Sequence, residues 1–146
     1  ALPICCTSLT TAPELPATTL ANGCYGLMFL ECTSLTTAPK LPATTLEVGC
    51  YSGMFKECTS LTTAPMLPAT ILKESCYQEM FLGCTSLKAV TCLARNISAF
   101  RCTYRWMRKV ASGGTFTIAA TMDEGQSWDD GDNGIPSGWS IVNYGG

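Results

Sequence analysis

Residues 33–58 read TSLTTAPKLPATTLEVGCYSGMFKEC, and this unit decides the fold because the chain repeats it. Its first seven residues also begin, unchanged, at Thr7 and at Thr59, a spacing of 26 residues in each direction. The repeats are therefore 7–32, 33–58 and 59–84, of which the first two agree at 20 of 26 positions and the last two at 17 of 26. One such unit has too little apolar surface to fold alone, so the repeats are expected to stack into a solenoid.

A fourth, degenerate copy occupies residues 85–110, where Leu87 keeps the register but Thr91 stands at the place of Pro65. Residues 1–110 are thus predicted to form the solenoid. Beyond them the composition changes, with the sequences TFTI and WSIV reading as short strands. Because the last coil of a solenoid leaves an apolar end open, residues 111–146 are predicted to be a β-rich C-terminal cap.

Comparison of the repeats separates inward from outward positions. Leucine, methionine and phenylalanine recur without change at several positions, such as Met28, Met54 and Met80, and these are expected to form buried ladders. Other positions change freely in charge and size, so they are expected to face solvent. The candidate partner-facing residues are Glu14, Lys40 and Met66, together with Thr10, Thr36 and Thr62.

Each unit is predicted to contain a short strand followed by a short helix. The stretch 35–38 is rich in β-branched threonine and suits a strand, which Pro39 would end because proline has no N–H to donate. In residues 50–58 the fixed apolar side chains fall at i, i+1, i+4, i+5 and i+8, a spacing typical of one face of a helix. Gly53 would weaken that helix.

These residues resemble the BspA-like leucine-rich repeats of bacterial surface proteins, whose unit reads Ala-Phe-x-x-Cys-x-x-Leu-x-x-Ile-x-Leu-Pro. The positions of that pattern are filled here by Met28-Phe29, Cys32, Leu35, Ala38 and Leu41-Pro42. The present unit differs by an added residue around Pro39 and by a longer second half. The resemblance covers residues 1–102. It implies an α/β fold, a right-handed leucine-rich-repeat solenoid with short parallel strands and short helices, and it implies an adhesive or binding role on the cell surface.

Eight of the ten cysteines are arranged in two ladders at the repeat period, and Cys5 and Cys92 stand outside them. Cys24 and Cys32 would lie about 12 Å apart on a helix, which is too far for a disulfide. Reduced, buried thiols are the preferred reading of the ladders, and some cross-linking is the alternative. Cys5 lies outside both ladders and is the best candidate for an exposed thiol. Zinc is not expected, since no C-x-x-C pattern and no histidine is present.

The composition also limits the chemistry of the chain. Nine basic and eleven acidic residues give a net charge of −2, with no basic stripe for nucleic acid. No apolar run reaches the roughly 20 residues of a membrane span. Residues 129–134, DDGDNG, offer the oxygen ligands of a calcium loop but lack its spacing, so a solvated turn is preferred and no cofactor is expected. No nucleophile has a base near it, and no enzyme activity is expected.

The predicted function is therefore a non-enzymatic leucine-rich-repeat module, secreted or on the cell surface, for protein binding or adhesion. Its partner would be a protein or a host-surface ligand. The alternative is a structural spacer or a self-assembling filament subunit, because nearly identical units and a chain that begins inside a repeat also suit end-to-end association.

Overall fold

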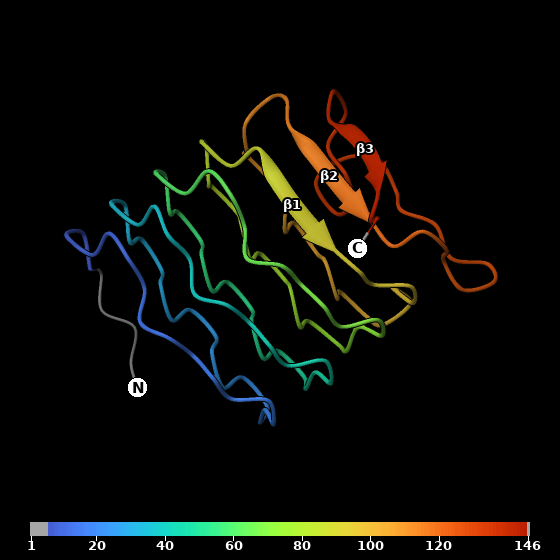
Figure 1. Ribbon diagram of the computed structural model, residues 1–146, viewed down its shortest axis with the longest axis horizontal. Helices are drawn as coiled ribbons and strands as arrows, with labels where there is room; N and C mark the ends of the chain where they lie inside the picture. Colours follow the sequence, from blue (N-terminus) through green and yellow to red (C-terminus); the bar gives the residue numbers. More distant parts are fainter. Residues whose placement is uncertain (1–5, 146) are drawn as a thin grey trace.

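The computed structural model describes residues 6–145 as a stack of coils, each coil corresponding to one repeat (Figure 1). Within that range the regular elements are three strands, β1 (Ala89–Cys92), β2 (Thr115–Ile118) and β3 (Ser140–Asn143). They lie side by side at the C-terminal end of the stack as one parallel sheet in the order β1-β2-β3 (Figure 1). Cys5 lies outside the described residues.

The predicted helices are absent from residues 6–145, so the expected α/β solenoid with short helices is wrong. The segments assigned to helices are runs of tight turns. These segments (residues 23–32, 49–58, 75–84 and 101–110) are called the turn face below.

The turn face has a regular hydrogen-bond pattern that explains why it is not helical. Alternate N–H groups close turns within the coil, as from Met28 to the carbonyl of Tyr25 at 3.2 Å. The N–H groups between them bond the next coil, as from Phe29 to the carbonyl of Met54 at 2.9 Å. Half of the donors thus hold neighbouring coils in register, whereas the donors of a helix would all bond within their own segment.

The turns require a left-handed residue at every fourth position. The backbone φ is positive at twelve turn-face positions: 23, 27, 31, 49, 53, 57, 75, 79, 83, 101, 105 and 109. Glycine occupies only four of these positions, Gly23, Gly49, Gly53 and Gly83. An L-residue in this conformation costs about 1–2 kcal/mol, which the bonds between coils must offset.

The other side of the stack explains the short strands. In the first three repeats the paired residues form isolated parallel bridges, such as Thr11 with Thr37, instead of strands. The fourth repeat has lost its prolines, and there β1 runs for four residues. Since proline cannot donate to a ladder, the proline positions account for this difference. The parallel register continues with offsets of 26 residues from β1 to β2 and 25 from β2 to β3.

The core is a set of ladders along the axis of the stack. Met54 and Met80 are fully buried. The phenylalanine that follows the methionine in each repeat stacks on its counterpart in the next coil, with ring centroids 5.8 Å apart for Phe55 and Phe81. The tyrosines form a second stack, with Tyr51 and Tyr77 6.1 Å apart. The core cluster draws on side chains from both sides of each coil, so the turn face and the strand side lie across it from one another.

The C-terminal segment lies over the end of the fourth coil. The ring of Trp128 stacks on buried Trp106 at 5.5 Å, and Phe116 contacts both rings. The Asn133 side chain accepts the N–H of Arg105 at 2.6 Å. The Gly134 carbonyl accepts the indole N–H of Trp106 at 2.9 Å. The backbone N–H groups of Arg105 and Met107, which have no further coil to bond, thus find acceptors in residues 132–133. The division of the chain at residue 110 stays a prediction.

Gly114, the residue just before β2, lies against the backbone of Lys88 in the preceding coil. A Cβ atom at Gly114 would lie 2.5 Å from the carbonyl oxygen and 2.8 Å from the Cα of Lys88. Both atoms belong to the backbone that accepts the Thr115 N–H, so they cannot move aside alone. Gly114→Ala is expected to lower the free energy of unfolding by about 1–3 kcal/mol in urea titrations.

Gly113→Ala is the matched control for this substitution. Its added Cβ would meet nothing nearer than the Gly138 carbonyl oxygen at 3.9 Å, an ordinary contact. The expected change in the free energy of unfolding is within about 0.5 kcal/mol. Equal effects of the two variants would mean that β2 does not approach Lys88 in solution.

Candidate binding surface

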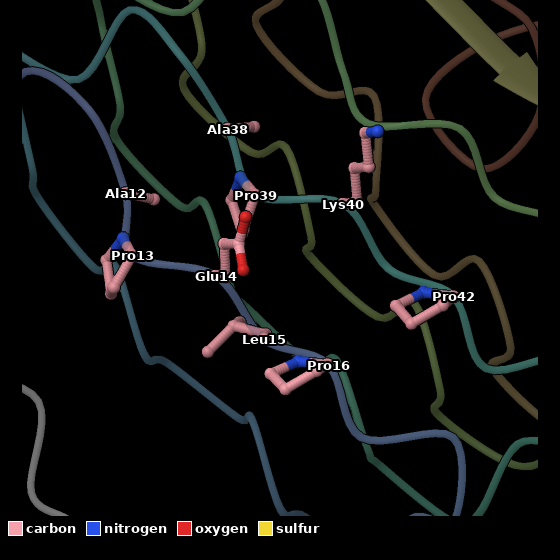
Figure 2. Close-up of a pocket in the computed structure, with 9 residues that line it drawn as sticks. All are labelled: Ala12, Pro13, Glu14, Leu15, Pro16, Ala38, Pro39, Lys40 and Pro42. Carbon is pink, nitrogen blue, oxygen red and sulfur yellow. The ribbon is translucent and has the colours of Figure 1, made fainter.

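Three short segments with the shared pattern Ala-Pro-x-Leu-Pro, in which x varies, border two grooves of the stack. They are residues 12–16, 38–42 and 64–68, called the proline face below. A groove of about 490 Å³ lies between the first two segments, and one of about 510 Å³ lies between the second and third. The constant prolines provide much of the lining, and the variable side chains stand between them (Figure 2).

All six residues predicted to face a partner are exposed. Glu14 and Lys40 line the first groove, and Lys40 also lines the second, together with Met66. Figure 2 shows Glu14 reaching toward the second coil, while Lys40 points away from the first. The predicted threonines (Thr10, Thr36 and Thr62) stand just before these segments and line neither groove. Their role as contacts stays a prediction.

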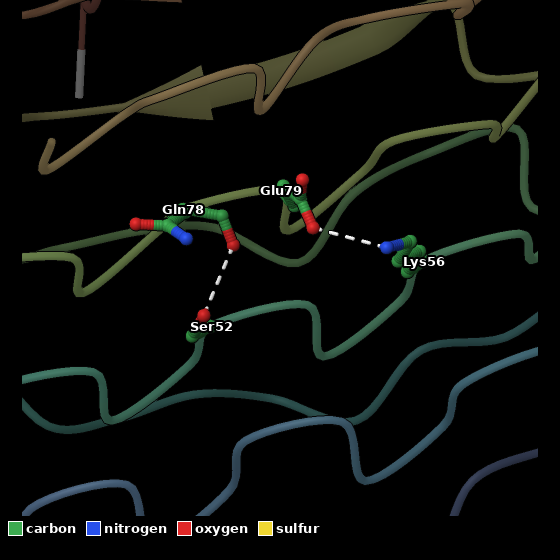
Figure 3. A network of polar contacts seen from close by, with 4 residues as sticks. All are labelled: Ser52, Lys56, Gln78 and Glu79. Atoms are coloured by element: carbon green, nitrogen blue, oxygen red, sulfur yellow. Dashed lines mark hydrogen bonds and ion pairs between the residues drawn. The ribbon is translucent and has the colours of Figure 1, made fainter.

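The charged side chains of the proline face, unlike Lys56 and Glu79 of the turn face, form no ion pair within residues 6–145. No ion pair of Glu14 or Lys40 occurs among the residues that the structure describes. On the turn face, by contrast, Lys56 pairs with Glu79 at 3.0 Å, and the Ser52 hydroxyl donates to the Gln78 carbonyl (Figure 3). The charges of the proline face are therefore available to an external ligand.

The cysteine ladders are packing elements within the described part of the chain. Nine described cysteines are free thiols, seven of them buried, while Cys6 and Cys24 are exposed. The Cys58 thiol donates to the Phe29 carbonyl at 3.1 Å, and Cys84 repeats this contact with Phe55 at 2.9 Å. Burial raises the pKa of the Cys50 thiol to about 11 and that of Cys58 to about 12.

We expect this burial to control thiol reactivity. In native protein at neutral pH, Cys6 and Cys24 should react rapidly with a disulfide reagent such as DTNB, and the buried thiols only after unfolding. Cys24→Ser should remove one rapid thiol, whereas Cys50→Ser should remove none. Full reactivity of the buried thiols in native protein, or their absence after unfolding without reductant, would contradict this expectation.

The same thiols make stability depend on alkaline pH. Their folded pKa values lie above the ordinary thiol pKa of 9.0, so above pH 9 the unfolded chain releases protons that the folded chain keeps. The contribution of these buried thiols to the free energy of unfolding is complete below pH 9 and is lost as pH rises toward about 12.

The acidic loop, residues 129–134, forms backbone and side-chain hydrogen bonds at the C-terminal end of the stack. Asp130 forms a bridge with Ile135, and the Asp132 carbonyl accepts the Met107 N–H at 3.1 Å. The Asn133 side-chain oxygen is engaged by Arg105, as described above. Among the described residues, no group of three or more acidic or cysteine side chains is arranged to hold a metal ion.

Sequence reasoning missed two features of the turn face. One is the left-handed positions, which the recurrence of glycine at Gly23, Gly49, Gly53 and Gly83, all in registers four residues apart, could have indicated. The other is a local concentration of basic residues in the fourth coil, hidden by the net charge of the whole chain.

Comparison of the chain with protein-family models, with curated proteins and with solved structures finds no match. Residues 6–145 include no helix with the length and apolar character needed to cross a membrane.

Proposed function

We propose that this protein is a non-enzymatic binding module that presents the proline face to a protein or host-surface ligand, outside the cell or on its surface. The observation that carries the proposal is the placement of Glu14, Lys40 and Met66 on a repeated proline frame beside two grooves. An anion, a cation and an apolar side chain thus follow one another across the surface. The resemblance of the repeat to units of bacterial surface proteins supports the same role.

The proline frame favours binding on entropic grounds. Proline fixes φ, so the backbone of the face loses little freedom when a partner binds. The hydrogen bonds between coils anchor the segments, as between the Ala12 N–H and the Thr37 carbonyl at 3.0 Å. A pre-ordered surface with unpaired charges suits selective contact with a complementary protein surface.

The test is a charge exchange that preserves net charge. Immobilised protein is screened by biolayer interferometry against purified extracellular-matrix and serum proteins. For a protein that binds specifically in this screen, the double variant Glu14→Lys/Lys40→Glu is expected to lower the affinity about tenfold, or by about 1.4 kcal/mol of binding free energy. The control exchange Glu47→Lys/Lys73→Glu lies outside the face and should leave affinity unchanged. Equal weakening by both exchanges would count against the proline face as the contact surface.

The alternative of a spacer or filament subunit has less support. Stacking end to end would need two open ends, and the loop around Asn133 and Gly134 already occupies donors at the C-terminal end of the stack. Sedimentation velocity over a concentration series tests it, because a filament subunit would grow with concentration.

A further inference from the structure

Charge is unevenly distributed along this chain. Residues 80–122 contain six of its nine basic residues and no acidic residue, although the whole chain carries a net charge of −2. Four of the six lie on the turn face of the fourth coil: Arg101, Arg105, Arg108 and Lys109. Residues 100–109 are called the basic strip below.

The backbone places three of these cations at strained positions. Arg101, Arg105 and Lys109 occupy all the left-handed positions of the fourth coil, with φ of 52°, 52° and 62°. Each of the three preceding coils has at least one glycine in the equivalent positions. Left-handed L-residues cost about 1–2 kcal/mol each. All three side chains are exposed.

Aromatic rings hold the two guanidinium groups in place. The Arg101 guanidinium carbon lies 5.1 Å from the ring centroid of Phe100 and 4.9 Å from that of Tyr104. The Arg105 guanidinium carbon lies 4.9 Å from the same Tyr104 ring. Phe100 is 65% exposed, the most exposed large hydrophobic residue among those described. Within residues 6–145 neither arginine forms an ion pair.

This arrangement leaves the arginines ready to bind oxyanions. Stacking uses the flat face of a guanidinium and leaves its in-plane N–H donors free for bidentate bonds to a carboxylate. A hollow of about 250 Å³ beside the rings is lined by Arg101 and Tyr104, and also by Asp129 of the acidic loop. A long polyanion would be repelled by that loop, whereas a short acidic segment can contact the arginines alone.

We propose that the basic strip binds a short acidic segment of a partner protein, whose carboxylates are held by Arg101 and Arg105. The strip lies on the turn face, across the core from the proline face, so it is a second surface independent of the proposed function. Phe100 supplies apolar contact beside the charges, the combination that is enriched at protein interfaces.

The test uses fluorescence anisotropy of a fluorescein-labelled hexaglutamate peptide with the intact protein at low salt. Saturable binding is expected, and the double variant Arg101→Gln/Arg105→Gln should weaken it about tenfold or more. Arg101→Lys/Arg105→Lys keeps the charge but loses the planar fork, and an intermediate loss is expected. The control Lys40→Gln/Lys73→Gln removes two positive charges elsewhere and should change affinity less than about twofold.

Three results would overturn the proposal. One is the absence of saturable binding, and a second is equal weakening by the arginine pair and the lysine control. The third is stronger competition by a heparin hexasaccharide or by oligothymidylate than by unlabelled hexaglutamate, which would make the ligand another kind of polyanion. The exchange variant Glu14→Lys/Lys40→Glu should still bind the peptide, so failure of one surface is distinguishable from failure of the other.

Discussion

Replacing Met54 by aspartate is expected to leave the protein unfolded at room temperature. Met54 has 0% exposure and lies in a ladder between Met28 and Met80, with no basic side chain in the core cluster. An unpaired carboxylate in such surroundings costs several kcal/mol even if it takes up a proton. Domains of this size are stable by only about 5–15 kcal/mol. Circular dichroism and urea titration would show the loss of the folded baseline.

Two substitutions separate the buried charge from other effects. Lys40→Glu reverses a charge on the exposed proline face, and the free energy of unfolding should change by less than about 0.5 kcal/mol. Met54→Leu preserves the apolar character and most of the volume, so its cost should stay below about 1.5 kcal/mol. Similar losses for Met54→Asp and Lys40→Glu would refute the assignment of inward and outward positions.

Removal of residues 111–146 is expected to cause aggregation or oligomerisation. The truncation deletes β2 and β3 and takes away the rings of Phe116 and Trp128 that cover Trp106, which is fully buried in the intact protein. It also removes the loop that accepts the N–H groups of Arg105 and Met107. An open coil end with apolar side chains and unpaired donors pairs readily with other chains. Light scattering measures the outcome.

Point variants of the loop provide the control. Asp129→Asn and Asp132→Asn change only exposed side chains and retain the Asp132 carbonyl, so their melting temperatures should stay unchanged with calcium or with chelator. A truncated protein that remains monomeric with an unchanged melting profile would show that residues 111–146 are an independent module. The search for function would then move to that segment.

The repeat period and the direction of the ladder side chains follow from the sequence alone. A ladder position must stay apolar in every coil, so the identity of Met28, Met54 and Met80 reveals burial without any structure. The strand predicted over residues 35–38 is wrong, because within that stretch only Thr37 pairs, in an isolated bridge with Thr11. The predicted effect of proline on pairing explains where a longer strand does form. Pro65 interrupts pairing in the third repeat, while Thr91 at the same place in the fourth lies within β1.

The helices were wrong because the apolar spacing was ambiguous. Apolar side chains at i, i+4 and i+8 in residues 50–58 fit one face of a helix only roughly. Each helical residue turns the chain by about 100°, so eight residues pass two full turns by about 80°. A ladder of turns repeats every four residues and fits the spacing without drift. Gly53 is at φ 62° in this ladder, where it is a required left-handed residue and not a weak point in a helix.

Tertiary structure decided the conformation of the turn face and the surroundings of the basic strip. Arg101 and Arg105 have little local reason to adopt positive φ, since left-handed L-residues are unfavourable in an isolated chain. They do so because the fourth coil aligns with its neighbours, as when the Arg105 N–H meets the Asn133 side chain. Hydrogen bonds between coils join residues about 26 positions apart, and no local pattern specifies them. The period of the stack is thus a property of the sequence, while the backbone within each period is settled by the neighbouring coils.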